Sequence, residues 1–227
     1  NQATLKGEYD ICAISFALYP FVKDDYALLR TAVSFGEGYG PKLIKKIGTK
    51  LKRNFKVALS GEFTTNALLF KIAYPEARIS YMNFLEIEEA VLNGTVDAGV
   101  LIHESILNYN KKLEVEKEMW DIWVELSGGG LPLPLGGMCL RRSIPLHSAI
   151  DYENTLIKAV EVANKNRHVL APMLIEKGLI RVNAATLDKY LDLYANDNSV
   201  KMSDIQYEAL DKLYELGYKN GFYENLI

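Results

Sequence analysis

Short apolar runs alternate with helical patterns up to about residue 150, and this alternation limits the possible folds more than any other feature. Strand-like runs cover residues 9–16, 55–59, 78–82 and 96–102. Helical patterns cover residues 67–74 and 84–93 between them, and 153–166, 167–177, 184–194 and 203–216 after them. Alternation of this kind predicts an α/β fold, in which strands and helices build the same layers.

The composition excludes several classes of protein. The chain has 227 residues, of which 49% are apolar and 24% charged, as in an ordinary globular protein and unlike a disordered chain. Its net charge of −3 offers no basic surface for nucleic acid. No apolar run approaches the ~20 residues of a membrane span, and no signal peptide opens the sequence. We therefore expect a cytoplasmic protein that acts on a small molecule, with neither nucleic acid nor a membrane as partner.

The sequence carries no motif for a metal or an organic cofactor. The glycines of residues 36–40 read G-x-G-x-G and lack the helix that a dinucleotide fingerprint requires. The histidine spacings suggest no metal cluster, and both cysteines lie in apolar runs, as buried free thiols do. These residues are His103, His147, His168, Cys12 and Cys139. We expect no cofactor and no metal, and we expect His147 and His168 to be surface or helix residues.

The turn after residues 55–59 has the composition of a site for an anion or a carbonyl oxygen. It leads through Gly61 to Thr64, Thr65 and Asn66, where a helical pattern begins. The first N–H groups of a helix lack partners within it, and cap hydroxyls add donors. Ordinary N-capping by one of the threonines would explain the same residues.

His103 follows directly on the strand-like run 96–102. Ligands of open α/β sheets bind beyond the carboxyl ends of strands, so this position favours a functional histidine. A histidine at the end of a strand can also be structural, and the neighbouring Glu104 can either orient it or face solvent.

Three other segments connect these elements. We expect a strand over residues 28–34, a solvated basic connector over 42–56, and a strand over 138–140. The glycine- and proline-rich residues 127–137 suit either a plain loop or a chain that crosses a cleft between two lobes. At the end of this region, Arg141 and Arg142 could meet a substrate carboxylate, although outward-facing salt bridges are the expected use.

Four segments, in this order, resemble those of the 1,4-dihydroxy-6-naphthoate synthases of the futalosine route to menaquinone. They are Ala13-Ile14-Ser15, residues 34–41 (SFGEGYGP), residues 61–65 (GEFTT), and residues 130–137 (GLPLPLGG) followed by Arg141-Arg142. His103-Glu104 lies between them. The LPLPLGG run is the most specific element, because the related chorismate dehydratases share the fold and lack that run.

The resemblance implies a two-lobe fold like that of the type II periplasmic binding proteins, with a ligand cleft between the lobes. Lobe 1 would hold residues 1–50 and 129–227, and lobe 2 residues 51–128. Members of the family carry a strand and a loop before the position where this sequence starts, so we expect a preceding strand and helix to be missing from lobe 1.

The resemblance also implies an activity, namely conversion of cyclic dehypoxanthinylfutalosine into 1,4-dihydroxy-6-naphthoate with release of a three-carbon fragment. His103 would be the proton acceptor. The implied substrate-binding residues are Ala13, Ile14, Ser15, Thr64, Thr65 and Asn66. Two alternatives stay open: a protein that binds a small carboxylate without catalysis, and a chorismate dehydratase.

Overall fold

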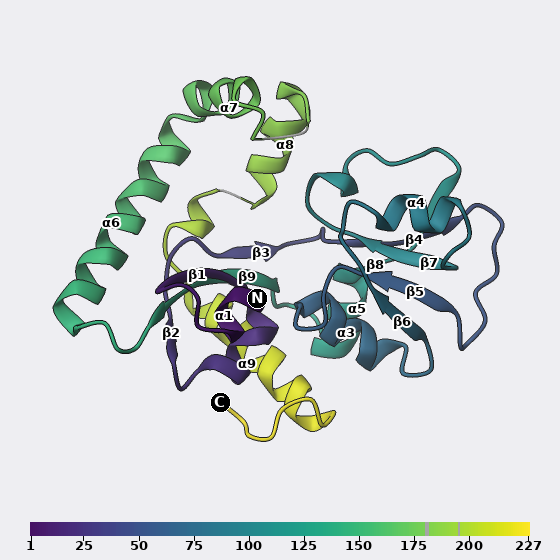
Figure 1. Cartoon of the computed structure of the whole chain (residues 1–227), viewed down its shortest axis with the longest axis horizontal. Coiled ribbons are helices and arrows are strands. Elements are labelled where there is room, and N and C mark those ends of the chain that lie inside the picture. Colours follow the sequence, from purple (N-terminus) through teal and green to yellow (C-terminus); the bar gives the residue numbers. More distant parts are fainter. Residues whose placement is uncertain (180–181, 195) are drawn as a thin grey trace.

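A computed structural model describes residues 1–179, 182–194 and 196–227, and its strands form two sheets that lie side by side (Figure 1). The first sheet contains β1 (Ile11–Ser15), β2 (Tyr26–Leu28), β3 (Ser34–Gly36) and β9 (Leu133–Arg141). The long strand β9 pairs antiparallel with each of the other three. This sheet is therefore built around one strand that arrives late in the sequence.

The second sheet has the order β6-β5-β7-β4-β8. Its strands are β4 (Lys42–Lys46), β5 (Lys56–Leu59), β6 (Arg78–Tyr81), β7 (Ala98–Leu101) and β8 (Leu113–Glu118). Strand β5 is parallel to β6 and β7, whereas β4 is antiparallel to β7 and β8. Its helices are α3 (Thr65–Ala73), α4 (Ile87–Leu92) and α5 (Met119–Ser127).

Alternate residues of the second sheet face two different hydrophobic clusters. In β5, Val57 and Leu59 join a cluster that also contains residues of α3, α5 and the first sheet, while Ala58 joins a cluster with Ile87 of α4. Burial on both faces explains why β5 reads as a continuous apolar run. The first of these clusters links the two sheets, because it includes Phe16 beside β1 and Leu133 of β9.

Shorter elements and the C-terminal helices complete the fold. The short ones are α1 (Gln2–Leu5), η1 (Phe16–Leu18), α2 (Tyr19–Val22), η2 (His103–Ile106) and η3 (Asp197–Ser199). The C-terminal helices are α6 (Leu146–Lys165), α7 (Arg167–Glu176), α8 (Ala184–Tyr194) and α9 (Asp204–Lys219). Helix α9 packs on the first sheet, and α6 and α7 project from the sheets as an arm (Figure 1).

Three expectations about local structure were wrong. Residues 29–33 are not a strand, because the chain turns between β2 and β3. Residues 42–46 are not a solvated connector but strand β4, in which Leu43 and Ile44 are completely buried. Residues 133–137 belong to β9, and the register with β3 shifts next to Pro134, between its pair with Phe35 and the pair of Gly136 with Ser34.

The position of β4 also bears on the expected lobe boundaries. We expected lobe 2 to begin at residue 51, yet β4 already pairs within the second sheet. The chain therefore first passes between the sheets within residues 37–41, through the glycine-rich turn. It returns between α5 and β9, through residues 128–132. The assignment of 129–227 to lobe 1 stays a prediction.

Candidate functional site

A cavity of about 950 Å³ lies between the two sheets. The seven residues expected to act as base or to bind substrate all line it: Ala13, Ile14, Ser15, Thr64, Thr65, Asn66 and His103. One wall comes from the end of β1 and the middle of β9, and the other from the segments that follow β5 and β7. The expected location beyond the carboxyl ends of strands therefore holds for β5 and β7.

The wall formed by β1 is fixed by pairing with β9. Ala13, Ile14 and Ser15 lie opposite Met138, Gly137 and Gly136. The Ile14 side chain is buried in a cluster with Cys12 and Tyr26, so Ile14 offers mainly its backbone to the cavity. Ser15 is partly exposed and is the one polar side chain of this triplet.

The opposite wall is the start of helix α3. Thr64 is the N-cap: its hydroxyl accepts from the N–H of Ala67 at 3.1 Å and donates to the carbonyl oxygen of Gly61 at 2.9 Å. Ordinary capping therefore accounts for this side chain. The N–H groups of Thr65 and Asn66 belong to the first turn and have no partner within the helix, so they are donors available to a ligand.

Thr65 and Asn66 differ in what their side chains do. The Thr65 hydroxyl donates to the carbonyl oxygen of Leu135 in β9 at 3.2 Å, and so ties the helix to the first sheet. The Oδ1 atom of Asn66 is buried without a hydrogen-bond partner. A buried polar atom without a partner is costly, and its place in a cavity wall is consistent with a role in binding.

His103 lies two residues beyond the end of β7. Its φ of 54° is a left-handed backbone conformation that residues other than glycine seldom adopt. Its ring meets the Phe84 ring edge-on, with centroids 5.1 Å apart. His103 is exposed to solvent and lines the cavity. Partial desolvation by the protein atoms around the imidazole lowers the pKa of His103 below its ordinary 6.5, and the Glu104 carboxylate opposes the shift. The imidazole is therefore mostly neutral near pH 7.

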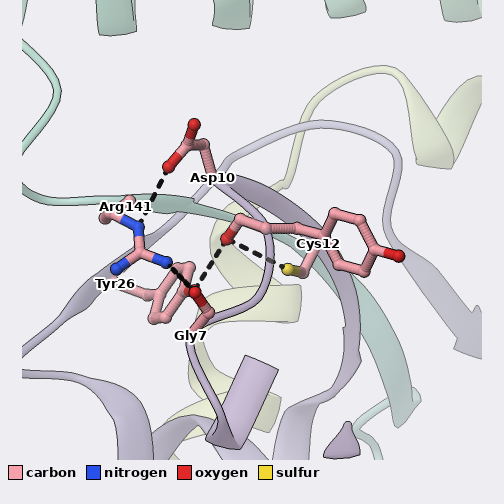
Figure 2. Close-up of polar contacts among 6 residues, drawn as sticks. Gly7, Asp10, Cys12, Tyr26 and Arg141 are labelled. Atoms are coloured by element: carbon pink, nitrogen blue, oxygen red, sulfur yellow. Dashed lines mark hydrogen bonds and ion pairs between the residues drawn. The ribbon is translucent and has the colours of Figure 1, made fainter. Parts of the chain in front are cut away.

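The two arginines at the end of β9 lie outside the cavity lining. Arg141 forms an ion pair with Asp10 at 3.0 Å and donates to the Tyr26 hydroxyl and to the Gly7 carbonyl oxygen (Figure 2). Arg142 donates to the carbonyl oxygens of Lys23 and Tyr26. The expected salt bridge is thus confirmed for Arg141, whereas among the described residues Arg142 bonds to backbone carbonyl oxygens in place of the expected salt bridge.

The structure also places the two cysteines and the two remaining histidines. Cys12 and Cys139 are free, buried and directly opposite each other in β1 and β9, as expected for buried thiols. His147 and His168 are exposed on α6 and α7. Within the described parts of the chain, no group of three or more histidine, cysteine or acidic residues could hold a metal ion. In the same residues, no helix is both long and apolar enough to cross a membrane.

Sequence reasoning missed Asn1, which lines the cavity together with Phe84. Asn1 forms hydrogen bonds with Ser15 and Phe63, which lie 14 and 62 positions further along the chain. No local pattern marks such contacts, so only the folded arrangement of α1 against β1 could reveal them.

The chain is similar to known proteins over most of its length. A family model described as menaquinone biosynthesis matches residues 1–219. A protein of Streptomyces coelicolor named 1,4-dihydroxy-6-naphthoate synthase is 30% identical, over 92% of this chain and 76% of its own length. One of the same name from Thermus thermophilus is 27% identical, over 94% of this chain and 78% of its own length.

Solved structures support the two-lobe fold. A crystal structure of a protein from Archaeoglobus fulgidus matches with a TM-score of 0.85 and 29% identity, covering 97% of this chain and 82% of that one. The periplasmic aliphatic sulphonate binding protein of Escherichia coli matches with a TM-score of 0.65 and 13% identity, over 100% of this chain and 75% of its own. The second match shows the fold alone and confirms the expected likeness to periplasmic binding proteins. From the family model and the sequence relatives together, this chain belongs to the menaquinone biosynthesis family.

Proposed function

We propose that this protein converts cyclic dehypoxanthinylfutalosine into 1,4-dihydroxy-6-naphthoate, as a carbon–carbon lyase that releases a three-carbon fragment. The observation that carries the proposal is the meeting of His103 with the helix start at Thr65 and Asn66 in one cavity. The names of the two sequence relatives support the choice of reaction. We propose a cytoplasmic location as well, since the reaction belongs to a biosynthetic route.

His103 would act as the general base. A base must be unprotonated to accept a proton, and the lowered pKa of His103 keeps its imidazole neutral near pH 7. After proton removal, cleavage of the carbon–carbon bond and aromatisation of the ring would leave negative charge on oxygen. The N–H groups of Thr65 and Asn66 would stabilise that charge, because donors at a helix start are fixed before the reaction.

Residues 13–15 would hold the substrate from the other side. The backbone of Ala13 and Ile14 and the hydroxyl of Ser15 lie in the β1 wall, across the cavity from α3. A volume of about 950 Å³ falls within the range of small-molecule sites, at its larger end. The cavity therefore has room for a substrate larger than a small carboxylate alone.

Incubation of the protein with cyclic dehypoxanthinylfutalosine, followed by mass spectrometry, tests this proposal. We expect 1,4-dihydroxy-6-naphthoate and a three-carbon product in equal amounts. Chorismate should be left unchanged in a parallel reaction. Elimination of water from chorismate, or tight binding of the futalosine derivative with no product, would overturn the proposal in favour of a dehydratase or a binding protein.

A further inference from the structure

The Asn1 side chain forms hydrogen bonds to both walls of the cavity. Its Nδ2 donates to the Ser15 Oγ at 3.2 Å and to the Phe63 carbonyl oxygen at 3.1 Å. Its Oδ1 accepts from the Ser15 N–H at 2.9 Å. Ser15 ends β1 in the first sheet, and Phe63 lies in the turn between β5 and α3.

These bonds use both N–H donors of the amide and one of the two lone pairs of its oxygen. Both N–H groups of Asn1 Nδ2 have an acceptor, and Oδ1 has a donor. The amide has no N–H left for a ligand, although it lines the cavity. Asn66 is the opposite case, because its buried Oδ1 has no partner. The Asn1 side chain thus joins the two walls of the cavity to each other.

The bond to Ser15 also decides what the Ser15 hydroxyl can do. A hydroxyl has one hydrogen to donate and lone pairs that accept. Since the Ser15 Oγ accepts from Asn1, its own hydrogen is directed away from the amide. Ser15 is partly exposed and lines the cavity, so this hydrogen is available there for an acceptor oxygen of a ligand.

We propose that Asn1 is a positioning residue that holds the Ser15 hydroxyl as a donor to a carboxylate or carbonyl oxygen of the substrate, and that sets the distance between the Ser15 wall and the turn at Phe63. This proposal rests on the function proposed above for its choice of substrate. The contacts themselves do not depend on that choice.

The variants Asn1→Ala, Asn1→Asp and Ser15→Ala separate the parts of this arrangement. Asn1→Asp keeps an acceptor for the Ser15 N–H and loses both donors. The Ser15 hydroxyl would then donate to the new carboxylate and turn away from the substrate. We expect KM for cyclic dehypoxanthinylfutalosine to rise about 5- to 10-fold in each variant, the effect of one lost hydrogen bond. The value of kcat should change less, because His103 is left in place.

A combination of substitutions shows whether Asn1 acts through Ser15. If it does, the KM of the double variant Asn1→Ala/Ser15→Ala should be no more than about 2-fold above that of either single variant. The reason is that the free-energy effects of substitutions at two interacting residues do not add. The matched control is Asn93→Ala, which removes an asparagine whose Oδ1 accepts from the Thr95 N–H and hydroxyl away from the cavity. Unchanged KM in Asn1→Asp, or strictly multiplicative effects in the double variant, would overturn the proposal.

A measurement without substrate keeps the two proposals apart. Amide hydrogen exchange of Ser15 should be slow in the wild type and in Asn1→Asp, and faster in Asn1→Ala, because only the alanine variant lacks an acceptor. If the wild type shows no turnover, the proposed reaction fails while the exchange result still reports on the Asn1–Ser15 contact. Fast exchange of this amide in the folded wild type would refute the positioning role, whatever the activity.

Discussion

Substitution of Gly136 by alanine tests how the cavity wall is built. Gly136 lies in β9 opposite Ser15 of β1 and Ser34 of β3. A Cβ atom at this position would lie 2.7 Å from the carbonyl oxygen of Ile14, and an ordinary contact begins near 3.4 Å. That oxygen belongs to the backbone of a paired strand and cannot rotate away. Strand β1 would have to move by about 0.7 Å, and the Ser15 wall would move with it.

Two opposing effects set the size of the change. Overpacking in a closely packed region costs about 1–3 kcal/mol. Replacement of glycine by alanine also restricts the unfolded chain, and this raises the free energy of unfolding by about 0.4–1 kcal/mol. We therefore expect Gly136→Ala to lower the free energy of unfolding by about 1–2 kcal/mol. For a chain of this length this corresponds to a fall in Tm of roughly 2–8 °C.

Thermal and urea unfolding measure this loss, with Gly61→Ala as the matched control. A Cβ at Gly61 would meet only the Thr64 Cγ2 atom at 3.5 Å, an ordinary contact, and the φ of Gly61 lies outside the left-handed region. The control should have the free energy of unfolding of the wild type or one that is higher by up to about 1 kcal/mol. In Gly136→Ala, KM for the substrate should rise as well, because misplacement of a binding wall by a fraction of an ångström impairs alignment. A variant with wild-type Tm and KM would refute the reasoning.

Three further predictions concern groups outside this strand pair. The value of kcat/KM should rise with pH through a midpoint below 6.5, because partial desolvation lowers the pKa of His103 in the free protein and only its neutral form accepts a proton; a midpoint above 6.5 in the kcat/KM profile would contradict this assignment. Burial raises the pKa of the Cys139 thiol to about 12, so at pH 8 a thiol reagent should label the folded protein far more slowly than the urea-unfolded protein, and equal rates would count against the structure. Arg141→Met should lower the free energy of unfolding by about 1–3 kcal/mol, through loss of the bonds to Asp10, Gly7 and Tyr26, and should change KM by less than about 2-fold.

The sequence pointed to the cavity-lining residues after β5 and β7 because their signals are local. A strand, a glycine turn and a threonine cap follow one another directly in residues 55–66, and the cap bond from Ala67 to Thr64 forms as expected. His103 is found by the same logic, since it comes immediately after an apolar run. Each of these residues is placed by its own strand, so chain order alone brings it to the cavity.

The sequence failed where pairing partners are distant. Strand β4 has only two buried apolar residues, Leu43 and Ile44, between lysines that suggest a solvated segment. It becomes a strand because β7 and β8 pair with it on both sides. The ammonium group of Lys45 forms an ion pair at 2.5 Å with the Glu116 carboxylate of the neighbouring strand β8. The role of Asn1 was hidden for the same reason, since its partners come from two separate elements.

The central claim is that neutral His103 is the base in this cavity, and His103→Asn tests it most directly. Asparagine tolerates the left-handed conformation that this position requires, so the variant should fold and bind as the wild type does. It has no group that accepts a proton near neutral pH. We predict that kcat for conversion of cyclic dehypoxanthinylfutalosine falls by about 10²- to 10⁴-fold while the substrate still binds. A kcat within a few-fold of the wild type would contradict the account.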